Sequence, residues 1–255
     1  MKKLYIIVAI SSLIIWVTPG IKAQVSVQDS VISSSLIYAA VGLQFPGGDM
    51  ADRYGISFSV GPGYLYKTSR NWLFGVEANF FFGDDVKIAD SLFKNIMTSN
   101  DFIIDGNGEG SIIGITQRGF SAWGKVGKLF PVLSPNPNSG LFFTLGAGYL
   151  SHNISISNLD NSAPQLDGDY RKGYDRLTAG PAVNLNIGYL YLSNHRLFNF
   201  MIGFELSQAW TKSLRDYDFD LMKADNQSRS DLLTGFKIGW IIPLYGRAPK
   251  EYYFY

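Results

Sequence analysis

The feature that most constrains this chain is a strict alternation of apolar and polar side chains over long segments. In residues 198–211, one parity is mostly aromatic and aliphatic, while the other carries asparagine, glycine, glutamate, serine and threonine. Successive side chains of a strand point to opposite faces, so the pattern predicts a strand with one apolar and one polar face. A soluble sheet would bury the apolar face, whereas a membrane barrel would turn it to lipid and the polar face to a lumen.

Eight segments of this kind follow one another along the chain. We place them at residues 35–45, 55–67, 72–82, 111–129, 140–157, 177–192, 197–213 and 231–245. Each reaches the ~9–11 residues that a tilted strand needs to cross a bilayer. Strands of soluble proteins are nearer ~5–6 residues, so the lengths favour a membrane protein.

The connections between these segments alternate in length. Residues 68–71, 130–139 and 193–196 form short connections, and residues 46–54, 83–110, 158–176 and 214–230 form longer ones. Short turns on one rim and long loops on the other are typical of outer-membrane barrels. The sequence therefore predicts an all-β fold, an eight-stranded antiparallel up-and-down transmembrane β-barrel with both termini in the periplasm.

The fourth segment is less regular than the others. Phe120 and Trp123 are three residues apart, so they cannot share a face of an undistorted strand. We expect a bulge or bend between them.

The N-terminus has the features of a secretory signal peptide. Lys2 and Lys3 precede an apolar run over residues 4–17, and Ala23 closes the segment. The run is short for a membrane-spanning helix, which needs ~20 residues. The expected organisation is a signal peptide at 1–23, a periplasmic segment at 24–34, the barrel at 35–245 and a periplasmic tail at 246–255.

Composition excludes several classes of function. The formal net charge is +1, and no basic stripe is present, so nucleic acid is not an expected partner. The chain has no cysteine, which excludes disulfides, thiolate catalysis and cysteine-based zinc sites.

Charged side chains on the polar faces point to the lumen of a narrow barrel. We expect a lumen charge network of Glu77, Glu205 and Lys237, joined by Arg118 or Lys125 from the irregular fourth segment. Side chains fill an eight-stranded barrel, and charges in so dry an interior must be paired. Glu205 and Lys237 lie on neighbouring strands and can pair. A filled structural lumen is the main interpretation, and an ion or proton path is the alternative.

An enzymatic site would need a general base near a nucleophile at the outer rim. The chain has two histidines, and His195 falls in a short inner turn. His152 lies near the outer end of the fifth segment without a partner serine at a recognisable spacing, so we expect a surface histidine and no catalysis.

Metal binding has one candidate segment. Asp216, Asp218 and Asp220 alternate like the start of a calcium loop, but Leu221 and Gln227 occupy the positions that need glycine and glutamate. We expect solvated loop charge, with no metal and no cofactor.

The last residues form an aromatic run of Tyr252, Tyr253, Phe254 and Tyr255, behind Pro249. Exposed aromatic clusters are unusual on a protein that acts alone. Three interpretations remain open for this tail: an assembly signal, a peptide that docks on a periplasmic partner, or a disordered end.

Several of these features together resemble a known group of proteins. They are the Ala23–Gln24 junction, the glycine-aromatic strands at 146–149 and 186–189, and the aromatic end. The chain resembles the small outer-membrane β-barrel proteins of Bacteroidota, a group that includes accessory barrels of the type IX secretion and gliding machinery. The resemblance implies an architecture and a compartment, and it singles out no particular member.

The function expected from the sequence is a non-enzymatic structural or accessory barrel in a bacterial outer membrane. Its expected partners are outer-membrane lipid and lipopolysaccharide, together with a periplasmic or outer-membrane protein. The alternatives are a narrow channel for ions or small solutes, a lipid A-modifying enzyme centred on His152, and a soluble periplasmic β-sandwich.

Overall fold

The computed structural model describes residues 30–158, 163–194 and 198–245. The expected signal peptide, the aromatic tail and His195 lie outside the described residues.

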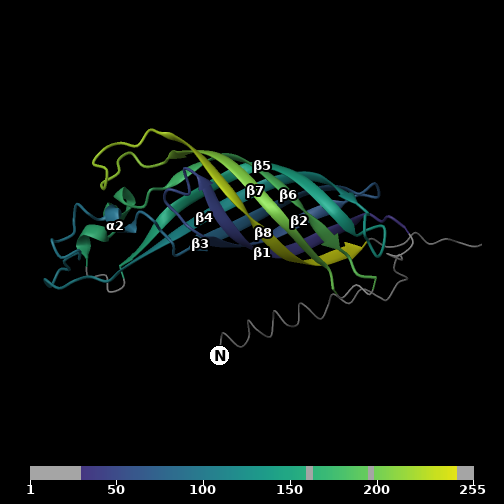
Figure 1. Ribbon diagram of the computed structural model, residues 1–255, viewed down its shortest axis with the longest axis horizontal. Helices are drawn as coiled ribbons and strands as arrows, with labels where there is room; N and C mark the ends of the chain where they lie inside the picture. The colour runs from purple at the N-terminus through teal and green to yellow at the C-terminus, as the bar shows by residue number, and fades with distance from the viewer. Residues whose placement is uncertain (1–29, 159–162, 195–197, 246–255) are drawn as a thin grey trace, which may run out of the picture. The chain divides into compact units, whose positions relative to one another are not determined.

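Eight antiparallel strands, each hydrogen-bonded to its neighbours in sequence order, close into a barrel (Figure 1). The strands are β1 (Ser34–Gly48), β2 (Ser57–Lys67), β3 (Trp72–Gly83), β4 (Ile113–Phe130), β5 (Gly140–Asn158), β6 (Thr178–Tyr191), β7 (Phe200–Ser213) and β8 (Ser228–Tyr245). The predicted all-β fold, a closed barrel of eight antiparallel strands, is confirmed, and every strand end lies within three residues of its predicted position.

Side chains alternate across the barrel wall as the sequence predicts. In β7, Phe200, Ile202 and Phe204 are exposed on the outside, whereas Glu205 and Ser207 are buried inside. The burial pattern of β2 alternates without a break over its 11 residues. The polar parity therefore faces the lumen and the apolar parity faces outward.

The expected bulge in β4 is absent, and that prediction was wrong. The pairing of β3 with β4 runs one to one from Trp72 with Lys128 to Gly83 with Gln117. Phe120 points outward, whereas Trp123 is an inward residue that is 3% exposed. The indole Nε1 donates to the Ser121 hydroxyl at 3.1 Å. A large aromatic side chain is thus accommodated on the lumen parity.

The two ends of the barrel differ in their connections. We call one end, bearing the connections 49–56, 84–112, 159–177 and 214–227, the long-loop end, and the other, bearing 68–71, 131–139 and 192–199, the short-turn end. The long loops contain α2 (Ala89–Leu92) and two 3-10 turns, η1 (Pro164–Leu166) and η2 (Tyr170–Gly173). Within the described residues, no helix is both long and apolar enough to span a membrane.

Apolar clusters occupy both ends of the interior. At the short-turn end the cluster consists of inward side chains, namely Leu36, Tyr38, Ala40, Leu65, Leu73, Leu129, Phe142, Leu190, Leu192, Met201 and Ile241. At the long-loop end, loop side chains fold over the inward strand residues; the loop members are Met50, Tyr54, Val86, Leu92, Phe93, Ile103, Ala163, Leu166 and Tyr174. The interior between the two clusters is polar.

Candidate functional site: the buried charges of the lumen

Four charged side chains meet in the middle of the lumen. They are Glu77 of β3, Lys125 of β4, Glu205 of β7 and Lys237 of β8, and each side chain is at most 6% exposed. All four occupy the inward parity of their strands, which is why barrel closure brings them together. We call this set the lumen charge network.

Lys237 joins the two carboxylates of the network. Its Nζ lies 2.5 Å from Oε1 of Glu77 and also contacts Oε2 of Glu205. Lys125 donates to the other oxygen of Glu77 at 2.8 Å. The pair of Glu205 with Lys237 is the one anticipated from the strand order, whereas the central place of Glu77 depends on contacts across the lumen.

Neutral donors complete the hydrogen bonding of both carboxylates. The Tyr38 hydroxyl donates to Glu77 at 2.5 Å, and the Asn79 amide donates to its other oxygen at 2.8 Å. The Asn186 amide donates to Glu205 at 3.2 Å. Sequence reasoning did not single out Tyr38, although its inward parity on β1 was a usable signal.

The position of Tyr38 depends on a glycine of the next strand. Its ring packs directly on Gly63, where an added Cβ would lie 2.1 Å from the Tyr38 Cζ. A side chain at this position would displace the ring and its hydroxyl from Glu77. Gly63 is therefore part of the site although it carries no functional group.

The lumen charge network balances its own charge. Two carboxylates face two ammonium groups, and each carboxylate also accepts a neutral donor. Burying an isolated charge is very costly, whereas a paired and hydrogen-bonded set can be held in a dry interior. The arrangement fills the middle of the lumen with mutually fixed side chains.

Arg118 does not belong to this network, and its expected place in the lumen was wrong. It pairs in register with Phe82 and Asn153 and is exposed on the outer face of β4. The expectation relied on an irregular fourth strand. Because β4 has no bulge, the outward parity of Phe120 continues to Arg118 unchanged.

A second polar cluster, the His152 cluster, lies nearer the long-loop end. Asp231 of β8 accepts hydrogen bonds from the Thr211 hydroxyl at 2.5 Å and contacts His152 Nε2 at 2.9 Å. Arg53, from the 49–56 loop, lies 3.6 Å from Asp231 and donates to the Thr178 hydroxyl at 3.1 Å. The cluster thus joins a loop to four strands, β5, β6, β7 and β8.

His152 is buried, so the expectation of a surface histidine was wrong. It is 1% exposed and packs edge-on against the Tyr54 ring, with centroids 5.4 Å apart. Burial lowers the pKa of the Arg53 guanidinium, and the charges of Tyr54 and Asp231 partly offset this shift. Burial also raises the pKa of the Tyr54 hydroxyl to about 12. Both rings are therefore buried together at the long-loop end.

The long loops are held together by ion pairs. Arg176 binds Asp218 at 3.2 Å and also Asp220, and Arg215 donates to Asp175 at 2.8 Å through Nε. Two of the three aspartates of the calcium-like segment are therefore already engaged by an arginine. Burial raises the pKa of Asp218 although Arg176 opposes the shift. The described residues contain no group of three or more acidic, histidine or cysteine side chains placed to hold a metal ion.

At the short-turn end, a lysine and two asparagines tie the N-terminal segment to a turn. Lys67 Nζ donates to the Ile32 carbonyl at 2.9 Å and to Asn138 Oδ1 at 2.8 Å. Asn136 donates to the Leu192 carbonyl at 2.6 Å, which links two turns of this end. These contacts join residues far apart in the chain, so no local pattern could predict them.

No family model matches this chain, and no curated protein matches it. Among solved structures, Neisserial surface protein A has 12% identity, covering 82% of this chain and 97% of its own, with a TM-score of 0.44. The attachment invasion locus protein Ail of Yersinia pestis, in complex with a heparin analogue, has 12% identity over 82% and 99%, with a TM-score of 0.40. The outer membrane protein OprG from Pseudomonas aeruginosa has 13% identity over 86% and 100%, with a TM-score of 0.36. Similarities this low transfer no property of those proteins to this chain.

Proposed function

We propose that this protein is a non-enzymatic barrel of a bacterial outer membrane, whose filled lumen serves as a scaffold for its outer loops and its periplasmic end. The observation that carries the proposal is that an apolar outer wall surrounds a lumen filled at both ends and in the middle. Each of these two features supports a different part of the function.

The outer wall supports a lipid environment. Every strand carries large apolar side chains on its outward parity that are at least 40% exposed. One example from each strand, in order, is Val41, Phe58, Val76, Phe120, Leu145, Ile187, Ile202 and Trp240. The largest apolar patch of a soluble monomer is about 300–600 Å², so a continuous belt around a barrel requires a non-aqueous partner. A bilayer covers such a belt completely.

The filled lumen supports a structural role over transport. The apolar cluster of the short-turn end, the lumen charge network and the loop-covered cluster of the long-loop end follow one another along the barrel. An eight-stranded barrel has an interior just wide enough for side chains. A solute would have to displace buried ion pairs as well as two apolar clusters.

The finer features of the proposal follow from the orientation. Long loops facing outward place both ends of the barrel chain in the periplasm, which agrees with an exported precursor and a periplasmic tail. The resemblance to small Bacteroidota barrels suggests an accessory role beside a secretion or envelope assembly. The partner would then contact the ion-paired outer loops or the aromatic tail.

Carbonate extraction of a membrane fraction tests the location. The protein should stay in the membrane pellet and require detergent, because the belt has only lipid to cover it.

A matched pair of variants tests which face of the strands meets lipid. Phe204→Arg should cost ~2–4 kcal/mol of folding free energy in refolding titrations, the penalty for arginine at mid-bilayer on the lipid face. Ser207→Arg should act instead by crowding the lumen. Recovery of the wild type in the soluble fraction after carbonate extraction would contradict the membrane location.

Deletion of residues 246–255 tests the accessory role. The refolded, heat-modifiable band of the purified protein should be unchanged, because the deletion starts after β8. In cells, lower insertion would identify the tail as an assembly signal, and loss of a periplasmic protein from pull-downs would identify it as a docking peptide. Normal insertion with an unchanged set of partners would reject both roles.

A further inference from the structure

Arg118 is an outward cation in an apolar setting. It lies on β4 toward the long-loop end, exposed beside Phe82 of the neighbouring strand and two residues from Phe120. Within the part of the chain that the structure describes, its guanidinium forms no hydrogen bond or ion pair. A guanidinium at this level of the outer wall is available to a ligand that comes from the membrane.

A groove with a preformed aromatic wall opens beside this guanidinium. Its volume is about 580 Å³, and its lining includes Arg118, Thr116 and Asp84 together with three phenylalanines, Phe58, Phe80 and Phe82. The rings of Phe80 and Phe82 stack with centroids 5.9 Å apart, and Phe58 lies 6.3 Å from Phe82. The groove therefore combines one cation, one hydroxyl, one carboxylate and an apolar wall.

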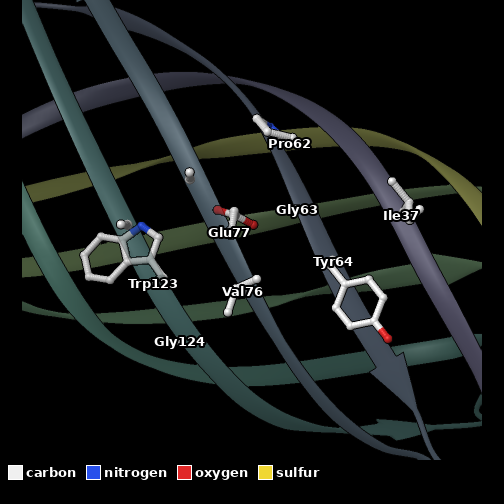
Figure 2. Close-up of a pocket in the computed structure, with 10 residues that line it drawn as sticks. Ile37, Pro62, Gly63, Tyr64, Val76, Glu77, Trp123 and Gly124 are labelled. Carbon is white, nitrogen blue, oxygen red and sulfur yellow. The ribbon is translucent and has the colours of Figure 1, made fainter.

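A second groove continues on the same strands toward the middle of the barrel. Its volume is about 610 Å³, and small residues of β2, β3 and β4, including Pro62, Ala78 and Gly124, form its floor. Figure 2 shows the side chains of Ile37, Tyr64 and Val76 around this floor. The lining is almost entirely apolar.

The register places the two grooves in line. Phe82 pairs with Arg118, and Ala78, four residues farther along β3 toward the short-turn end, pairs with Ala122. Four residues of strand span ~13 Å. A molecule with its head at Arg118 can therefore lay a chain over Phe80 and into the second groove.

We propose that β2, β3 and β4 form a binding site for one phosphorylated glycolipid of the outer leaflet. Its phosphate binds Arg118, sugar hydroxyls meet Thr116 and Asp84, and an acyl chain occupies the groove floored by Gly124. The inference rests on the proposed membrane location.

Charge and shape both select this class of ligand. A guanidinium presents a fork of N–H donors that matches a phosphate bidentately. Asp84 accepts hydrogen bonds, so it disfavours a bare anion and favours a phosphate that is carried next to hydroxyl donors. A free phosphate would leave both apolar grooves uncovered.

Native mass spectrometry of the detergent-solubilised, folded protein tests the site. The probes are bisphosphorylated lipid A, the same lipid without phosphates, and phosphatidylglycerol. The wild type should retain one lipid A molecule. Arg118→Gln should weaken retention by about tenfold or more, the usual worth of a charge-assisted hydrogen bond. Lys212→Gln is the matched control, because Lys212 is also an outward cation near the long-loop end but lies outside both grooves.

A second pair of variants tests the acyl groove independently. Gly124→Leu should reduce lipid retention without loss of the heat-modifiable band, because an added Cβ meets only the Ala147 carbonyl at 3.8 Å. Ala147→Leu, on the outward parity of the next strand but outside the grooves, should retain the lipid as the wild type does.

Several results would overturn the site. Equal retention of the dephosphorylated lipid would remove the role of Arg118, and equal retention of phosphatidylglycerol would remove the selection for a sugar head. An equal loss in Lys212→Gln would reduce the effect to general charge attraction. A folded protein that requires detergent but retains no lipid A rejects this site alone, whereas a protein soluble without detergent rejects the membrane location.

Discussion

The two buried polar clusters of the barrel differ in how completely they are satisfied. In the lumen charge network, every carboxylate and ammonium has a close partner. In and beside the His152 cluster, five buried polar atoms lack a hydrogen-bond partner among the described residues: Arg53 Nε and Nη2, His152 Nδ1, Asp231 Oδ1 and Tyr54 Oη. A satisfied network fixes one arrangement, whereas a partly satisfied cluster is held by the packing around it. We therefore expect the middle of the lumen to be more sensitive to single substitutions than the long-loop end.

The largest expected effect is that of Lys237→Met. The change leaves Glu205 and one oxygen of Glu77 without their cation, and breaking a buried pair typically costs ~3–5 kcal/mol. Refolding titrations in detergent, followed by the heat-modifiable band, measure this loss. The double variant with Glu205→Gln should recover part of it. Strictly additive losses would mean that the two side chains do not interact.

Gly63→Ala should destabilise the folded barrel less than Lys237→Met does, because it displaces the Tyr38 ring and leaves every charge paired. The added Cβ overlaps the Tyr38 ring, and overpacking of a filled interior typically costs ~1–3 kcal/mol. The same refolding titration measures the effect, and Gly124→Ala, on the open outer side, serves as the control. If both alanine variants were equally stable, the Tyr38 ring would not be held against Gly63.

His152→Leu should have a smaller effect than either change in the lumen. Asp231 keeps the Thr211 hydroxyl and Arg53, and the substitution also removes the unpartnered Nδ1 atom. We expect a loss of about 1 kcal/mol, the net worth of one hydrogen bond. A loss as large as that of Lys237→Met would show that the two clusters do not differ in the way proposed.

The smallest expected effect is that of acid on the stability of the long loops. Burial raises the pKa of Asp225, but the hydrogen bond from Arg229 outweighs it, and the pKa lies below its usual value. A depressed carboxyl pKa stabilises the folded loops above the unfolded value of ~3.9 and loses this contribution as the pH falls through the folded value. Loop proteolysis should therefore rise below about pH 4. Asp225→Asn should lessen that change, and an unaltered profile would reject the contribution of the pair.

The strands were predictable because the period-2 pattern is a local property of the sequence. The pair of Glu205 with Lys237 was also predictable, since it needs only neighbouring strands. Contacts across the lumen were not, because they depend on how the whole barrel closes. Glu77 with Lys237 and His152 with Asp231 are separated by 160 and 79 residues.

The misplacement of Arg118 has a different cause. A bulge between Phe120 and Trp123 would put both aromatic side chains on one apolar face, and it would leave the parity of Arg118 undetermined. Trp123 faces the lumen because apolar clusters, as well as polar residues, line the interior. The assumption that aromatic side chains face only outward therefore failed, since Tyr38, Phe81 and Phe142 also lie on the inward parity of their strands.

Planar-bilayer recording of the purified, folded protein tests whether the lumen is filled. We expect no steady conductance for the wild type, because two apolar clusters and the lumen charge network occlude the barrel. Stable and uniform single-channel steps would contradict the filled lumen and favour a narrow channel for ions or small solutes.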